Sequence, residues 1–129
     1  MAADRLISSG GPWESVIGYS RATVAGDYVH VSGTTATVGG VLQHAGDAYN
    51  QTLTAFTVIA EALAQAGMTL DDVVRTRVFL ANADDMDEVG RAHGELLGEI
   101  RPAATMLAGL QFINADMLVE IEADAYRRS

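Results

Sequence analysis

Apolar and polar residues alternate along several short stretches of the chain, which is the pattern of strands that bury one face. The clearest examples are residues 28–32, 72–80 and 118–126. Gly-Asp and Gly-Gly steps separate some of these stretches, and such steps are typical of tight hairpin turns. The pattern predicts strands at residues 5–8, 20–25, 28–32, 34–38, 41–43, 72–80, 103–107 and 118–126.

Two longer stretches repeat their apolar residues every three to four positions, which predicts helices with one buried stripe. The first covers residues 47–66, with Asp47 as the expected N-cap and Gly67 just past its end. The second covers residues 85–97, where Asp85 and Glu88 have the spacing of a capping box. Its buried stripe is predicted to contain Met86, Val89, His93, Leu96 and Ile100.

This order of elements favours an α/β (α+β) fold with one mixed six-stranded sheet and both helices on one face. The length fits a single domain over residues 1–129. The other face of the sheet is then uncovered, and we expect it to carry Val73, Arg75, Arg77, Glu120 and Glu122. A mixed polar and apolar sheet face of this kind is usually buried by self-association.

The net charge of the chain limits the classes of partner that it can bind. The net charge is −9 and the basic residues are dispersed, apart from Arg127 and Arg128. Nucleic-acid binding needs clustered positive charge, so we expect no nucleic-acid partner, and an anionic membrane surface is equally unsuited. No apolar run reaches the about 18 residues that span a bilayer, and the N-terminus lacks the features of a secretory signal. We expect a cytoplasmic protein.

Few residues are suited to cofactor or covalent chemistry. The absence of cysteine excludes disulfides, thiolate nucleophiles and zinc-thiolate sites. His30, His44 and His93 have no metal-ligand spacing, and His93 lies on the apolar stripe of its helix, where a packed, hydrogen-bonded histidine is expected. Phosphate-loop and dinucleotide fingerprints are also absent. We predict neither a metal nor an organic cofactor.

A motif in the last third of the chain is more informative. Residues 90–106 read GRAHGELLGEIRPAATM, and residues 119–123 read VEIEA. Both segments closely resemble the Rid/YjgF family, the reactive intermediate deaminases once labelled endoribonuclease L-PSP. The resemblance extends to residues 18–22, 29–34 and 72–79 and to the first helix, which is nearly the whole chain.

The resemblance implies a chorismate-mutase-like fold and a homotrimer whose sheets form a central barrel, with small-molecule clefts between subunits. Well-known members hydrolyse enamines and imines such as 2-aminoacrylate to 2-keto acids and ammonia without a cofactor. In them an arginine binds the substrate carboxylate, and a glutamate helps to activate water.

Four positions of this chain match the cleft residues of the family. Glu120 stands at the position of the family glutamate. Tyr19 stands at the position of a tyrosine that closes the cleft from a neighbouring subunit. Ser32 and Gly33 match a Ser-Gly step that shapes the cleft floor. Trp13, in a Gly-Pro loop ahead of Tyr19, either forms an aromatic wall of the cleft or covers an edge of the fold.

Three cleft positions depart from the family pattern and mark a divergent subgroup. Ala104 stands where the family has its substrate-binding arginine, Met106 stands where Cys, Ser or Thr is common, and Gly90 replaces an asparagine. An alanine cannot form the two-pronged ion pair by which an arginine holds a carboxylate. Standard 2-aminoacrylate deamination is therefore expected to be weak or absent.

Two classes of function stay open at this point. The first is an enzyme that hydrolyses an imine, enamine or related carbonyl compound, with Glu120 activating water. The second is a non-catalytic trimer that binds a metabolite or has a regulatory role. Arg75 and Arg77 either replace the missing arginine or, as the charge pattern favours, neutralise Glu120 and Glu122 in the barrel interior.

Overall fold

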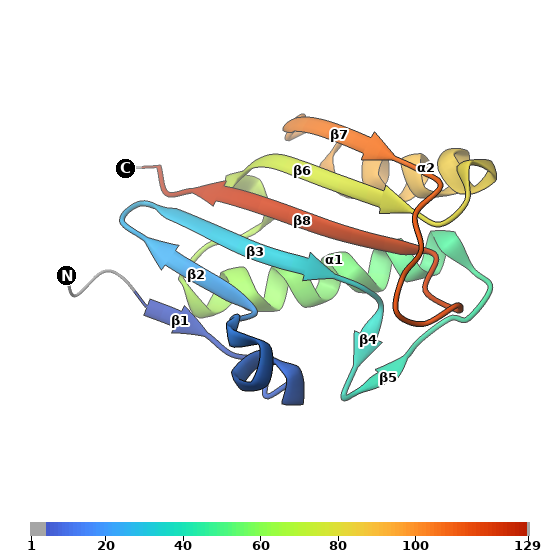
Figure 1. Ribbon diagram of the computed structural model, residues 1–129. Coiled ribbons are helices and arrows are strands. Elements are labelled where there is room, and N and C mark those ends of the chain that lie inside the picture. Colours follow the sequence, from blue (N-terminus) through green and yellow to red (C-terminus); the bar gives the residue numbers. More distant parts are fainter. Residues whose placement is uncertain (1–4, 129) are drawn as a thin grey trace.

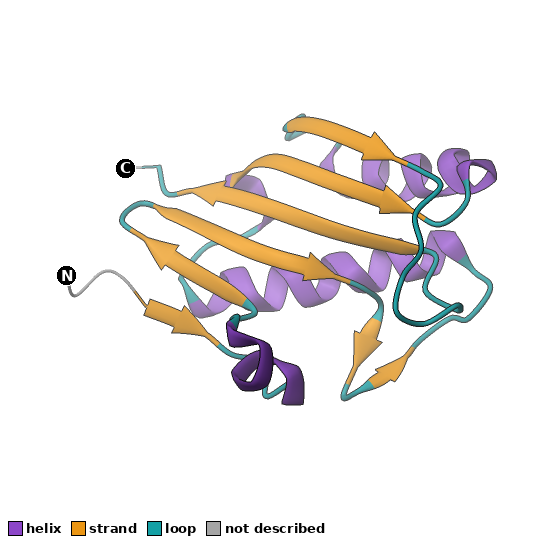
Figure 2. Ribbon diagram, viewed as in Figure 1, coloured by secondary structure: helices purple, strands orange, loops and turns teal. Residues whose placement is uncertain are grey.

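One six-stranded sheet, backed by two helices, carries the fold in the computed structural model, which describes residues 5–128 (Figure 1). The strand order is β1-β2-β3-β8-β6-β7, with β6 and β7 parallel and every other neighbouring pair antiparallel. Both helices lie against the same face of the sheet (Figure 2), as predicted. The elements of these two layers are β1 Arg5–Ile7, β2 Ala22–Ala25, β3 Tyr28–Thr34, α1 Ala48–Gln65, β6 Val73–Leu80, α2 Met86–Leu97, β7 Ala103–Leu107 and β8 Val119–Tyr126.

The first helix begins and ends where the sequence predicts. The Asp47 side chain accepts a hydrogen bond from the Asn50 amide at 3.0 Å, which satisfies one of the free N–H groups of the first turn. Gly67 follows the helix with φ of +75°, a left-handed conformation that glycine adopts without a steric penalty. Phe56, Ile59 and Leu63 of this helix are fully buried against the sheet.

The start of the second helix differs from its prediction. Asp85 makes no side-chain capping bond, because it already has helical backbone angles as the last residue of a short 3₁₀ turn, η3 Ala83–Asp85. Asn82 caps that turn instead, accepting from the Asp84 amide at 2.9 Å. Met86, expected in the buried stripe, is exposed, whereas Val89, Ala92 and Leu97 are buried. The capping-box interpretation and the assignment of Met86 are therefore wrong.

Three further segments lie outside the sheet. β4 Thr37–Val38 and β5 Val41–Leu42 form a separate hairpin around Gly39 and Gly40, both with positive φ, as their sequence predicts. A 3₁₀ turn, η2 Leu70–Asp72, leads into β6, so that strand begins at Val73. A π-helical turn, η1 Glu14–Gly18, follows the Gly-Pro loop, and no sequence pattern predicted it.

The two faces of the sheet have different chemistry. Val119, Ile121, Ala123 and Ala125 of β8 are buried beneath the helices, so the intervening carboxylates point to the uncovered face. Glu120 and Glu122 share that face as predicted.

Val73 is the exception to the predicted face assignment in β6. It was expected beside Arg75 on the uncovered face, but a register shift between Val73 and Arg75 turns it into the core. A bulge changes the parity of a strand, and strict alternation cannot anticipate it.

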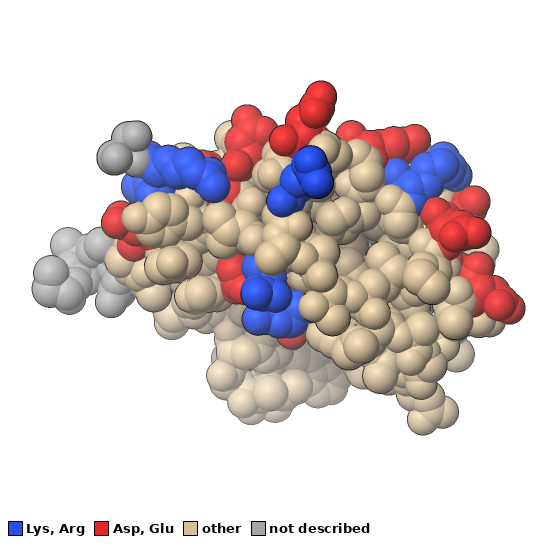
Figure 3. Space-filling view, turned by 90° about the horizontal axis from the view of Figure 1, so that it is seen from above, with Lys and Arg blue, Asp and Glu red and all other residues tan. Residues whose placement is uncertain are grey.

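The surface charge is divided among small groups. On the side seen in Figure 3, arginine side chains lie apart from one another, with acidic groups and uncharged surface between them. Within residues 5–128, neither long helix has the length and apolar character needed to cross a membrane.

Candidate functional site

Glu120 lies at a corner of the uncovered face, where the start of β8 pairs with the end of β3. Gly33 is immediately beside it: a methyl group added at Gly33 would lie 2.8 Å from Oε2 of Glu120 and 3.0 Å from its Cδ. The absence of a side chain at Gly33 leaves this space to the carboxylate, which a Cβ would displace from its present position. The pairing of β3 with β8 also shifts register between Val31 and Thr34, which places the Gly33 backbone under Glu120.

A set of hydrogen bonds fixes this part of β3. The Ser32 hydroxyl donates to the Ser20 carbonyl at 2.6 Å, and the Ser32 amide donates to the Arg21 carbonyl at 3.0 Å. The Arg21 Nη2 donates to the Gly33 carbonyl at 2.5 Å. We call Arg21, Ser32, Gly33 and Glu120 the Glu120 corner. Its backbone is held on both sides, so the carboxylate has a defined floor.

The electrostatics of the corner favour a proton on Glu120 more than in water. Burial raises the pKa of Glu120, the Arg21 charge opposes that rise, and Glu122 adds to it. The net direction is upward, toward the range in which a carboxylate both accepts and donates a proton.

Arg21 is a functional candidate that the sequence reasoning did not single out. Its Nε is buried and has no hydrogen-bond partner among residues 5–128. The Arg21 charge also acts on Glu14, a buried carboxylate that accepts from the hydroxyls of Ser8 and Ser9. Burial works to raise the pKa of Glu14, but these hydrogen bonds and Arg21 together lower it. Arg21 therefore lies between two carboxylates, and its place directly after Tyr19-Ser20 in the motif was the only signal for it.

The neighbouring carboxylates on the same face have a separate cation. Arg77 Nη1 is 3.5 Å from Glu122 and 3.2 Å from Asp124, and His30 Nδ1 is 2.8 Å from the other oxygen of Asp124. In the ladder Arg77 is opposite Glu122, whereas Phe79 is opposite Glu120. The arginine whose charge acts on Glu120 is thus Arg21, whereas Arg77 forms an ion pair with Glu122.

Ala104 and Met106 lie in a different place. Both belong to β7, the last strand of the sheet, and they are opposite Thr76 and Val78 of β6, which are buried toward the helices. Their side chains therefore face α2, while Glu120 points from the other side of the sheet, with β6 between. They line a pocket of about 150 Å³ between the second helix and the edge strand. We call it the α2–β7 pocket, and it is lined by Val78, Gly90, His93, Ala104, Thr105 and Met106.

Trp13 and Tyr19 are at the opposite end of the sheet from this pocket. They flank η1, just before β2, and the Tyr19 amide donates to the Glu14 carbonyl at 2.9 Å. Both aromatic side chains are exposed. One chain therefore brings Glu120, Ser32 and Gly33 together and keeps Ala104 and Met106 apart from them.

The comparisons with known proteins decide the family. The family model described as endoribonuclease L-PSP matches residues 12–127. The chain belongs to the Rid/YjgF family. Its relatives include an uncharacterized protein of Streptomyces coelicolor, 48% identical over 97% of this chain and 93% of that protein. A 3-aminoacrylate deaminase, RutC, of Acinetobacter baylyi is 31% identical over 84% of this chain and 86% of its own length.

A solved structure supports the same conclusion. The crystal structure of a Mycobacterium tuberculosis member of the YjgF/YER057c/UK114 family is 44% identical and superposes with a TM-score of 0.85, covering 95% of this chain and 98% of that one. The fold is therefore the chorismate-mutase-like fold of Rid/YjgF proteins, as the sequence motif implied.

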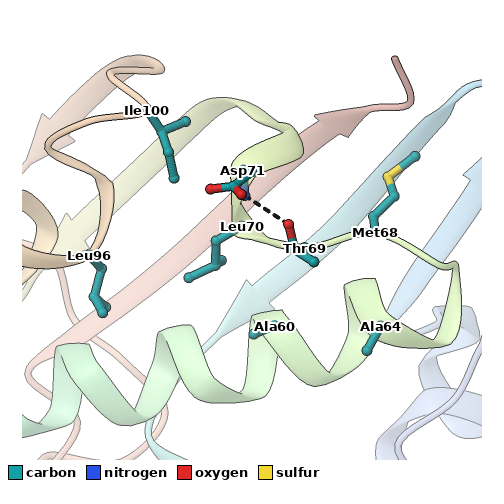
Figure 4. A pocket seen from close by; sticks show the side chains of 8 residues that line it. All are labelled: Ala60, Ala64, Met68, Thr69, Leu70, Asp71, Leu96 and Ile100. Atoms are coloured by element: carbon teal, nitrogen blue, oxygen red, sulfur yellow. Dashed lines mark hydrogen bonds between the residues drawn. The ribbon is translucent and has the colours of Figure 1, made fainter. Parts of the chain in front are cut away.

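Another hollow of this Rid/YjgF chain lies on the helix side of the sheet. It is an open apolar groove of about 460 Å³ between α1, η2 and the end of α2 (Figure 4). Among the described residues that line the groove, Asp71 is the one with a charge, and its amide donates to the Thr69 hydroxyl. The groove is remote from Glu120, across the sheet. It is lined by Ala60, Ala64, Met68, Thr69, Leu70, Asp71, Leu96 and Ile100.

Proposed function

We propose that this protein binds a small metabolite in clefts between the subunits of a homotrimer. We further propose that Glu120 activates water there to hydrolyse an imine, an enamine that has been protonated at carbon to its imine form, or a related carbonyl compound. The observation that carries the proposal is the Glu120 corner: a half-buried carboxylate over a glycine floor, with a raised pKa and an arginine beside it. The deaminase activity in the name of the Acinetobacter relative points to the same reaction class.

The chemistry suits the residues present. Water adds to the carbon of the C=N bond while the Glu120 carboxylate accepts a proton from it and the nitrogen is protonated. The resulting carbinolamine loses ammonia as its C–N bond breaks and the C=O bond forms. One imine and one water thus give one carbonyl compound and one ammonia. The sequence contains no lysine and no cysteine, so neither side chain offers a competing covalent route.

The arrangement of the site supports an assembly. One chain carries the Glu120 corner on the uncovered face of the sheet and the α2–β7 pocket on the helix side, with β6 between them, so these two halves come close only if separate chains meet. The uncovered face and its margins also expose large apolar side chains, which association would bury. These side chains are Leu6, Val16, Ile17, Tyr28, Leu107 and Tyr126.

The ligand of this cleft is expected to differ from an amino-acid-derived imine. Ala104 supplies no charge, and the two nearest candidates to replace an arginine face the other way: Arg75 is opposite Ala103 and Arg77 is opposite Thr105 in the β6–β7 ladder. Arg21 is already between Glu14 and Glu120. Losing one buried charge pair costs about 2–5 kcal/mol, or roughly 30-fold to several thousand-fold in binding. Standard 2-aminoacrylate deamination should be slow in consequence.

An assay with imines generated in solution tests the proposal. Imines of different side chains that lack a carboxylate are produced from primary amines by a flavin amine oxidase, and formation of the carbonyl product is followed with the wild type, Glu120→Gln and Glu122→Gln. Removing a general base costs about 10²- to 10⁴-fold, so Glu120→Gln should fall to the buffer rate. Glu122→Gln, on the same strand face but paired with Arg77, should retain its activity. A wild-type rate that Glu120→Gln retains would show that Glu120 is not the base.

The alternative is a non-catalytic binding trimer, and Ala104 is the observation that favours it. In that case no imine in the panel reacts faster with protein than in buffer, yet ligands still raise the melting temperature. The family description mentions a ribonuclease, but the net charge of −9 opposes RNA binding. Within residues 5–128, His30 and His93 also lie on different faces of the sheet, bonded to Asp124 and Thr76 respectively.

A further inference from the structure

The α2–β7 pocket is a built cavity with uncharged walls. Its lining combines the apolar side chains of Val78, Ala104 and Met106 with the imidazole of His93, the bare backbone of Gly90 and Thr105, whose side chain is directed to the other face of β7. A Cβ built on Gly90 meets no atom within 4 Å, so the pocket is open there because the helix has no side chain at that position. A charged group entering such a pocket would lose its hydration without gaining an ionic partner.

His93 is held in a fixed orientation at this pocket. Its Nε2 is 2.9 Å from the Thr76 hydroxyl, and its ring meets Phe56 edge-on, with centroids 5.7 Å apart. Burial lowers the pKa of His93, so the imidazole is neutral at pH 7. In a neutral imidazole one ring nitrogen donates and the other accepts, and the Thr76 hydroxyl can serve either role, so Nδ1 can pair with a ligand atom of the complementary kind.

The second ring nitrogen of His93 is available to a ligand. Within residues 5–128, His93 Nδ1 has no hydrogen-bond partner. Unlike Arg21 Nε, which is unpaired and buried, Nδ1 is not enclosed by the protein. Solvent therefore reaches Nδ1, and the pocket is a hollow that the ring lines. A polar atom at the wall of an otherwise apolar cavity orients a ligand and gives it specificity.

We infer that the α2–β7 pocket binds a small uncharged ring, or a branched group of similar size, that carries one hydrogen-bonding atom for His93 Nδ1. A cavity of about 150 Å³ is large enough for a benzene-sized group. The inference rests on the proposed function, because it treats the α2–β7 pocket as one half of the proposed cleft and names the part of the ligand that this half would bind. It makes His93 a specificity-determining residue in a pocket that Ala104 and Gly90 leave open.

Binding of three matched probes tests the inference without any reaction. Phenol, toluene and benzoate are titrated into the full-length protein, and the His93 ring resonances are followed by NMR. Phenol should bind and shift the His93 signals, toluene should bind about three- to tenfold more weakly because it lacks one hydrogen bond, and benzoate should not bind. Toluene binding as well as phenol, or benzoate binding best, would overturn the inference.

Three variants separate ligand recognition from effects on folding. His93→Gln retains a group that can reach Thr76 but loses the Nδ1 atom, so phenol should bind no better than toluene. Gly90→Leu should fill the pocket and reduce phenol binding at least tenfold. Gly94→Leu is its matched control, because a Cβ at Gly94 also meets open space but Gly94 does not line the pocket. Undiminished phenol binding by Gly90→Leu would place the probe elsewhere and overturn the inference.

The same titrations distinguish this inference from the proposed reaction. Glu120→Gln should keep the order phenol, toluene, benzoate, because that order depends on His93 and on the uncharged lining of the α2–β7 pocket. If no imine is hydrolysed but phenol, toluene and benzoate bind in the predicted order, the proposed reaction is wrong and the inference about the α2–β7 pocket is supported. If hydrolysis depends on Glu120 but phenol does not bind, the pocket inference alone is overturned.

Discussion

The Glu120 corner and the α2–β7 pocket differ in every property that matters for a ligand. The corner is charged and hydrogen-bonded, with a carboxylate, an arginine and a backbone fixed by Ser32. The pocket is uncharged, with one neutral imidazole among apolar walls. Under the proposed function, the corner supplies the carboxylate that activates water, whereas the pocket presents Ala104 where an arginine would hold a substrate carboxylate. The contrast is the basis for proposing a Rid/YjgF-type reaction on a different ligand.

The largest expected effect comes from making the pocket cationic. Ala104→Arg should accelerate deamination of 2-aminoacrylate by about 30-fold to several thousand-fold, because the new guanidinium supplies the missing partner of the carboxylate. Keto-acid formation from enzymatically generated 2-aminoacrylate measures it, with Ala103→Arg, on the other face of the same strand, as the control. No gain in Ala104→Arg would mean that this pocket is not the carboxylate half of the cleft.

A smaller effect on the reaction rate is expected when a side chain is introduced at Gly33, beneath Glu120. Gly33→Ala places a methyl group 2.8 Å from Oε2 of Glu120, so the carboxylate must shift. A displacement of this size costs about 10²-fold in rate. The carboxylate is the end of a flexible side chain, so the free energy of unfolding should fall by no more than about 1–2 kcal/mol.

Parallel rate and urea-denaturation measurements check the Gly33→Ala prediction. Gly94→Ala, in an open helical position, serves as the control and should leave the rate unchanged. Full activity in Gly33→Ala would show that the position of Glu120 is not critical.

Removing Arg21 should shift the pH dependence of the reaction. The Arg21 charge holds the pKa of Glu120 below the value that burial alone would give, so Arg21→Met should raise that pKa further. Glu120 must be ionised to accept a proton, and the rise in rate with pH should therefore move to higher pH. The pH profile of kcat/KM measures the shift, and Arg75→Met provides a control from the same face. A shift toward lower pH would contradict the assigned role of Arg21.

The smallest effect concerns stability. The pKa of Glu120 is raised in the folded state, so its contribution to stability is complete below the ordinary value of 4.5 and is lost as the pH rises through the folded-state pKa. Glu120→Gln does not titrate. The melting temperature of Glu120→Gln minus that of the wild type should therefore increase by a few degrees at most between pH 4 and pH 8. If the melting temperature of Glu120→Gln minus that of the wild type fell as the pH rose, the raised pKa would be contradicted.

Local patterns predicted much of the fold. Alternation in β8 placed Glu120 and Glu122 on the uncovered face, and Asp47 and Gly67 marked the ends of α1, because these features depend on neighbours in the chain. Val73 and Met86 were misplaced because a bulge and a 3₁₀ turn changed the phase of the pattern. The π-helical turn η1 has no apolar repeat that would predict it.

The site depended more on pairing between distant segments. The sequence motif identified Glu120, Ser32 and Gly33, which lie together in one chain. It did not reveal Arg21 as the cation beside Glu120, since that contact requires β2, β3 and β8 to be adjacent. The separation of Ala104 from Glu120 likewise follows from the parallel β6–β7 pairing, which periodicity does not encode.

The central claim is that the two halves of the cleft come from different chains, and sedimentation equilibrium at micromolar concentration tests it most directly. The account predicts a single species of three times the 13.6 kDa chain mass. A monomer under these conditions would contradict it, because one chain holds the Glu120 corner and the α2–β7 pocket on opposite faces of its sheet.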